Sequence, residues 1–179
     1  MNEIIAISIS TILYGVTMKV ADLLNEHGLK WFRGSAMVFG FAWGVFGSLV
    51  IILGGPIIAN IVLAMNVAFI IRMRLDYLNH SLAATIIIIC FLLSSAFNPI
   101  IFLIFYFIFL IFGSLKDYVG DVLQDNGKLV MLNEPMLYYS IPTLIYSFIF
   151  GDWMVFVTFT LFVIAYDVTK YIYFRKGYK

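Results

Sequence analysis

The fold is decided by one uncharged stretch, GSAMVFGFAWGVFGSLVIILGGPIIANIVLAMNVAFII, at residues 34–71. An apolar segment of about 18 residues or more is long enough to cross a bilayer as a helix. The Gly-Gly-Pro triplet at 54–56 is a turn signal near the middle of the stretch. The stretch therefore predicts two membrane-spanning helices joined by a tight turn.

The rest of the chain has the same character. It is 63% hydrophobic and 12% charged, whereas soluble domains carry about 25% charged residues. A second uncharged run covers residues 81–115, and neither run alternates polar with apolar residues as the strands of a membrane β-barrel do. We therefore predict an all-α polytopic transmembrane bundle that forms a single integral membrane domain over residues 1–179. The sequence contains no nucleic-acid-binding motif, and the lipid bilayer is the expected partner.

Two further turn signals, at residues 98–99 (Asn-Pro) and 151–152 (Gly-Asp), divide the chain into about seven spans. The predicted spans are 4–18, 35–53, 56–73, 82–97, 99–115, 136–150 and 153–172. In this arrangement the three tight turns lie on one side of the membrane, and the longer connections lie on the other side.

The basic residues indicate which side is cytoplasmic. All 11 Lys and Arg residues fall on the side of the longer connections in the seven-span arrangement. Cytoplasmic loops of membrane proteins carry an excess of Lys and Arg. We therefore predict a multi-pass protein whose N-terminus is outside and whose C-terminus is cytoplasmic.

An acidic heptad occurs twice in the chain. DLLNEHG at 22–28 and DVLQDNG at 121–127 share an Asp, an aliphatic residue, a Leu, an amide, an acid and a final Gly. Four predicted spans separate the two heptads, so both lie on the cytoplasmic side. We interpret them as a parallel internal repeat in which spans one to three match spans five to seven, with halves at about residues 1–80 and 99–179.

The carboxylates of these segments have helical spacing. Asp22 and Glu26 are one turn apart, as are Asp117, Asp121 and Asp125, so each set would share one helix face. Carboxylates on one face repel each other unless a cation lies between them, and Mg²⁺ takes oxygen ligands of this kind together with substrate phosphates. The pattern favours a metal and diphosphate site between two acidic clusters. The alternative is a pair of solvated loops in which acids and bases balance.

The same segments resemble the two Asp-rich motifs of the UbiA prenyltransferase superfamily. KDYVGDVLQDNGK at 116–128 is similar to the second motif, and KVADLLNEHGLKWFRG at 19–34 resembles the first. IRMRLDYLNH at 71–80 lies where the family often has a basic stretch. The resemblance implies an intramembrane, Mg²⁺-dependent enzyme of isoprenoid lipid metabolism. Such an enzyme transfers a prenyl chain from a prenyl diphosphate, or another phosphorylated lipid, to a lipid or aromatic acceptor at the cytoplasmic face.

The resemblance also assigns roles to particular residues. The expected metal ligands are Asp22, Asn25, Glu26, Asp117, Asp121 and Asp125. The cations expected to clamp the diphosphate are Lys19, Arg72, Arg74 and Lys128. Metal and cations together would stabilise the leaving diphosphate, so Asp22, Asp121 and Arg72 are the predicted catalytic residues.

Other readings stay open at this point. Each basic residue could instead be a topology signal, and His80 is expected in a solvated loop, with ligand or proton acceptor as the alternative. The chain could be a non-catalytic membrane scaffold, or a transporter whose acids bind a cation. An ion pathway needs polar groups across the bilayer, and the predicted spans offer almost none near their middle, which favours a pocket on one side. An oligomer or a partner membrane protein could supply further spans.

Overall fold

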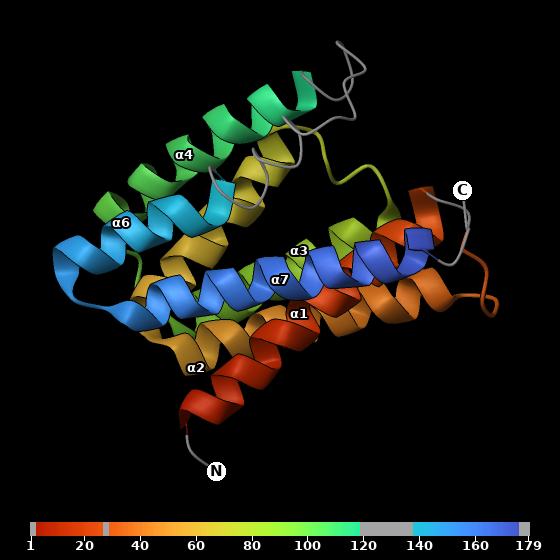
Figure 1. Ribbon diagram of the computed structural model, residues 1–179, viewed down its shortest axis with the longest axis horizontal. Helices are drawn as coiled ribbons and strands as arrows, with labels where there is room; N and C mark the ends of the chain where they lie inside the picture. The colour runs from red at the N-terminus through yellow and green to blue at the C-terminus, as the bar shows by residue number, and fades with distance from the viewer. Residues whose placement is uncertain (1–2, 27–28, 119–137, 176–179) are drawn as a thin grey trace.

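The computed structural model describes residues 3–26, 29–118 and 138–175, and within these ranges every regular element is a helix (Figure 1). The helices are α1 (Glu3–Glu26), α2 (Ser35–Ile71), α3 (Leu78–Ser94), α4 (Pro99–Asp117), α6 (Ile141–Phe150) and α7 (Trp153–Arg175). The predicted all-α class is therefore confirmed.

Four of these helices, α1, α2, α4 and α7, are long and apolar enough to cross a membrane. Helix α3 is also apolar but shorter, at 17 residues. Large apolar side chains cover the outer surface of the bundle, as Ile100, Ile104 and Phe107 do on α4, where each is about half exposed or more. An apolar surface of this extent suits contact with lipid, as predicted for an integral membrane protein.

Helix α2 is broken at the predicted turn. Gly55 has φ 74° and ψ −179°, a conformation that glycine adopts without the clash of a Cβ atom. The following Pro56 cannot donate a backbone hydrogen bond across the break. The fully buried Asn60 then ties this region to the connection between α3 and α4: its Nδ2 donates to the carbonyl of Ala96 at 2.9 Å and its Oδ1 accepts from the Asn98 N–H at 2.8 Å. The two halves of α2 consequently point in different directions (Figure 1).

Glycines bring the first half of α2 close to α3. A Cβ atom on Gly40 would lie 2.6 Å from the Cβ of Asn79, and one on Gly44 would lie 2.9 Å from Ile86. Small residues at this spacing allow helix backbones to approach closely in membrane bundles. The contact places the start of α3, including Asn79 and His80, against the centre of the bundle.

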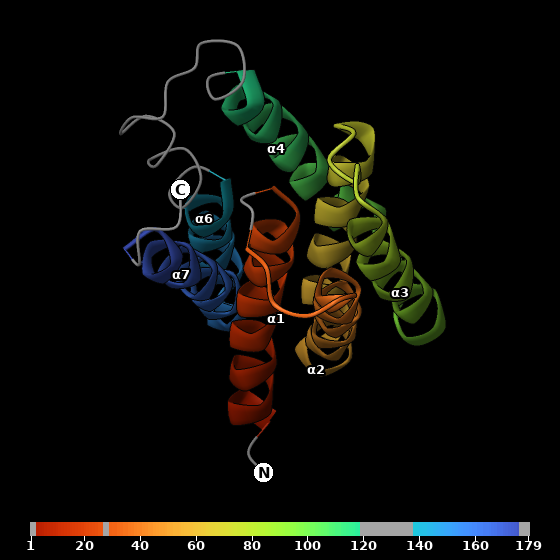
Figure 2. The same ribbon diagram turned by 90° about the vertical axis from the view of Figure 1, so that its right-hand side faces the viewer.

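The helix ends segregate to two sides of the bundle. In Figure 1 the ends of α1, α4 and α7 and the starts of α2 and α3 lie toward the right, whereas the break in α2 and the connection between α6 and α7 lie toward the left. Figure 2 shows α1 in the centre, with α7 and α6 on one side of it and α2 and α3 on the other. The residues that precede and follow the longer connections therefore meet at one end of the bundle.

Two helices extend beyond the limits of the predicted spans. Helix α1 does not end near residue 18 but continues to Glu26, because Val20, Ala21 and Leu23 are buried apolar residues at helical spacing. Helix α3 begins at Leu78, four residues before the predicted span. The seven spans and the internal repeat stay predictions, since the second heptad lies outside the described residues.

Candidate functional site

A pocket of about 220 Å³ lies at the end of the bundle where the helix ends meet. Its walls come from α1, the two halves of α2, the start of α3, the end of α4, α7 and the neighbouring connections. The Asp, His, Lys and Arg residues that line it are Asp22, Arg72, Arg74, Asp76, His80, Lys116, Asp117 and Asp167. Asp22 and Asp117, from segments far apart in sequence, both line this pocket, whereas the second heptad lies outside the described residues.

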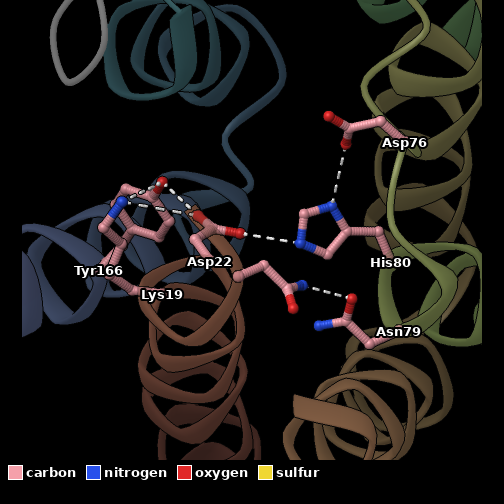
Figure 3. A network of polar contacts seen from close by, with 7 residues as sticks. Lys19, Asp22, Asp76, Asn79, His80 and Tyr166 are labelled. Carbon is pink, nitrogen blue, oxygen red and sulfur yellow. Dashed lines mark hydrogen bonds and ion pairs between the residues drawn. The ribbon is translucent and has the colours of Figure 1, made fainter. Parts of the chain in front are cut away.

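Asp22 is the centre of a first polar network, drawn in Figure 3. Its Oδ2 accepts a hydrogen bond from the Tyr166 hydroxyl of α7 at 2.8 Å and lies 3.6 Å from Lys19 Nζ, one turn earlier on α1. Its Oδ1 lies 3.3 Å from His80 Nε2 on α3. Asp22 is buried, with 8% of its surface exposed. One carboxylate thus connects three helices.

His80 lies between two carboxylates. Its Nε2 faces Asp22, and its Nδ1 lies 3.6 Å from the Asp76 Oδ1. Trp43 and Tyr77 contact the imidazole with their rings in edge-on geometry. The expectation of a solvated loop is wrong for His80, because it lies within α3 and is buried.

A second link joins α1 to α3 beside this network. The Asn25 Nδ2 donates to the Asn79 Oδ1 at 2.6 Å. Asn25 is absent from the lining of the described pocket, although it was an expected metal ligand. Its observed contact is structural, since it holds the start of α3 against the end of α1.

Asp117 is the centre of a second polar network, at the end of α4. Its Oδ2 accepts from Arg72 Nε at 3.0 Å and from an Arg72 terminal nitrogen at 2.7 Å. Its Oδ1 pairs with Arg74 at 2.7 Å. The other terminal nitrogen of Arg72 donates to the Tyr138 hydroxyl. Hydrogen bonds between ionised groups are roughly twice as strong as neutral ones, so this network is held firmly.

The expected diphosphate clamps are distributed differently. Arg72 and Arg74 line the pocket. Lys19 is buried beside Tyr166, donating to its hydroxyl at 3.2 Å with Nζ 4.7 Å from the ring centroid, and it is not part of the pocket lining. Lys128 lies outside the described residues, and Lys116 lines the pocket instead.

The described residues do not by themselves form a magnesium site. Within the described part of the chain no group of three or more His, Cys, Asp or Glu residues is placed to hold a metal ion. Both oxygens of Asp22 and both oxygens of Asp117 already face donors or cations. Asp121 and Asp125 lie outside the described residues, as does the side chain of Glu26, so the expected ligand set cannot be assembled from what is described.

Sequence reasoning missed the tyrosines of the site. Tyr166 bonds Asp22 and Tyr138 bonds Arg72, yet both belong to apolar segments in which aromatic residues are abundant. Tyrosine in such a segment normally indicates an interfacial belt, so composition gave no signal for either residue.

The observations define a class: a helical protein with membrane-spanning character and an ion-paired, aromatic-walled pocket at one end of the bundle. No family model, no curated protein and no solved structure matches the chain.

Proposed function

We propose that this protein binds a prenyl diphosphate, or another phosphorylated lipid, in the pocket and transfers its prenyl chain to a lipid or aromatic acceptor, as the UbiA resemblance implies. The observation that carries the proposal is the meeting of Asp22, from the first motif segment, with Asp117, from the second, in one pocket that also holds two arginines.

The walls of the pocket suit an amphiphilic ligand. Arg72, Arg74 and Lys116 supply positive charge on one side, and arginine binds phosphate groups through paired N–H donors. Met18, Phe69, Leu75, Phe162 and Val163 supply apolar surface. Ligand pockets of this kind combine apolar walls with a few polar groups that fix the orientation of the ligand.

The transfer itself would break the bond between the prenyl C1 carbon and the diphosphate oxygen, which leaves with the electron pair. A bond then forms between C1 and the acceptor, which gives up a proton. The arginines would stabilise the negative charge of the departing diphosphate. The resemblance also implies Mg²⁺, which would add positive charge to stabilise the diphosphate, with Asp121 and Asp125 among its expected ligands.

We further propose the seven-span arrangement with the pocket facing the cytoplasm and the N-terminus outside. Two observations support it: the break at Gly55 divides α2 into two segments, and the ends of the helices that flank the longer connections lie on one side (Figure 1). All 11 basic residues fall on that side in this arrangement, where the positive-inside rule expects them.

Binding of geranylgeranyl diphosphate to the detergent-purified protein tests the proposal. Arg72→Gln should weaken binding by about 1.5–3 kcal/mol, the usual range for a hydrogen bond to a charged group, which is roughly 10- to 150-fold. Arg33→Gln is the matched control, because Arg33 is exposed and does not line the pocket. Absence of binding to the unaltered protein, with and without Mg²⁺, or equal binding by both variants, would contradict the proposal. Binding without prenyl transfer would favour the scaffold alternative.

A further inference from the structure

We infer that Asp117 is a positioning residue that holds Arg72 and Arg74 as a two-arginine phosphate clamp, and that it is not a metal ligand. The inference rests on the proposed function, because the clamp is useful only to a phosphorylated ligand. It differs from the role that the sequence suggested for Asp117, and it concerns a contact that joins α4 to the end of α2.

Both oxygens of Asp117 are engaged by the arginines. Arg72 approaches Oδ2 through two nitrogens, and Arg74 approaches Oδ1. Arg72 is the cap residue that directly follows α2, and Arg74 lies two residues further, in the connection to α3. Without a shared anion the two guanidinium groups would repel each other. Asp117 therefore lets both cations occupy the same wall of the pocket.

Helix α4 is shaped to receive the guanidinium of Arg72. A Cβ atom on Gly113 would lie 2.0 Å from an Arg72 terminal nitrogen, so a side chain at this position is incompatible with the observed contact. Gly113 lies one turn before Asp117, on the same helix face. The rings of Phe69 and Tyr138 lie 5.8 and 5.6 Å from the guanidinium carbon. Only 5% of the Arg72 side chain is exposed.

In this position Arg72 still has N–H donors that a ligand could use. A guanidinium has five N–H donors, and the contacts described for Arg72 use three of them: one to Tyr138 and two to Asp117. Each terminal nitrogen retains one N–H, and Arg72 lines the pocket. A cation whose geometry is set before binding loses less conformational entropy when the ligand arrives.

The charge immediately around Asp117 favours an anion over a metal ion, whereas Asp22, Asp76 and Asp167 line other parts of the pocket. Two guanidinium groups and one carboxylate leave this group with a net positive charge, and Lys116 beside it lines the same pocket. A divalent cation approaching Asp117 would meet that positive charge, whereas a phosphate would be attracted by it. The two roles for Asp117 consequently predict opposite effects when its charge is removed.

The experiment measures binding of geranylgeranyl diphosphate to the full-length protein in EDTA and, separately, in Mg²⁺. If Asp117 positions the arginines, Asp117→Asn should weaken binding about tenfold or more in both conditions, because charged hydrogen bonds to Arg72 and Arg74 are lost. If Asp117 is a metal ligand, the same variant should leave binding in EDTA unchanged or stronger, since a negative charge has been removed, and should weaken binding in Mg²⁺.

A second variant keeps the Asp117 carboxylate and reduces the space available to the Arg72 guanidinium. Gly113→Ala should weaken binding in EDTA as Asp117→Asn does, whereas Ser114→Ala, at an exposed neighbouring position on α4, should have no effect. Circular dichroism and gel filtration check that each variant is folded. No binding by the unaltered protein in either condition overturns the proposed function. Binding that requires Mg²⁺, or that survives Asp117→Asn and Gly113→Ala in EDTA, overturns this inference alone.

Discussion

Replacing Asp22 by Asn tests whether its carboxylate is the buried partner of Lys19 and His80. The exposed fractions of the Lys19, Asp22 and His80 side chains are 5%, 11% and 5%. Removing one partner of a buried ion pair typically costs about 3–5 kcal/mol, because the other charge stays buried without compensation. Because Asn has nearly the same size as Asp, the loss of stability would come from the missing charge and not from a cavity.

The size of the effect can be measured by thermal unfolding in detergent. For chains of roughly 150–250 residues, 1 kcal/mol shifts the melting temperature by about 2–4 °C, so Asp22→Asn should lower it by roughly 6–20 °C. Asp76→Asn is the matched control. It removes the other carboxylate that faces His80, but the Asp76 side chain is 56% exposed, and exposed pairs contribute about 1 kcal/mol or less.

The comparison also separates an ion-pair centre from a metal ligand. If Asp22 is the centre of ion pairs, Asp22→Asn should lower the melting temperature in EDTA, and adding Mg²⁺ should not change the size of this shift. A metal ligand would show the opposite pattern: a melting temperature in EDTA that is unchanged or raised, and loss of any stabilisation by Mg²⁺. Equal small shifts for Asp22→Asn and Asp76→Asn would refute the reasoning from burial.

Two further predictions concern single hydrogen bonds. Asn60→Ala removes the side chain that bonds the Ala96 carbonyl and the Asn98 N–H in the connection between α3 and α4. Each lost hydrogen bond contributes about 0.5–1.5 kcal/mol, so the melting temperature should fall by at least about 2 °C, and an unchanged value would contradict the role of Asn60 at the α2 break. Tyr138→Phe removes only the hydroxyl that receives a hydrogen bond from Arg72. Geranylgeranyl diphosphate binding should weaken about fivefold, as expected for about 1 kcal/mol. A loss of affinity as large as that of Arg72→Gln would show that Tyr138 contacts the ligand directly.

Local sequence determined the helices and most of their limits. The uncharged run at 34–71 is long enough for two helical segments, and the Gly-Gly-Pro triplet within it could form a break because glycine alone tolerates the backbone of Gly55. The end of α1 was harder to predict. The acids at its end suggested a solvated segment, whereas the apolar residues between them are buried and extend the helix.

The sequence predicted only part of the site. The sequence suggested Asp22 and Asp117 as metal ligands and Arg72 and Arg74 as diphosphate clamps, and all four line the pocket. Composition could not say which charge would pair with which, because the energy of an ion pair depends on distance and burial rather than on position in the chain. The sequence therefore suggested acids gathered around a metal, while the structure shows Asp22 and Asp117 paired with neighbouring cations or donors.

The chemistry that each residue carries, and the spacing that places it near a helix end, were determined by the sequence alone. Tertiary structure decided the partners: Arg72 meets Asp117 across 45 positions and Tyr166 meets Asp22 across 144. Close approach at Gly40 and Gly113 decides which helices pack together. Such contacts arise only when distant segments are packed side by side, because short-range attraction and steric exclusion act between neighbours in space.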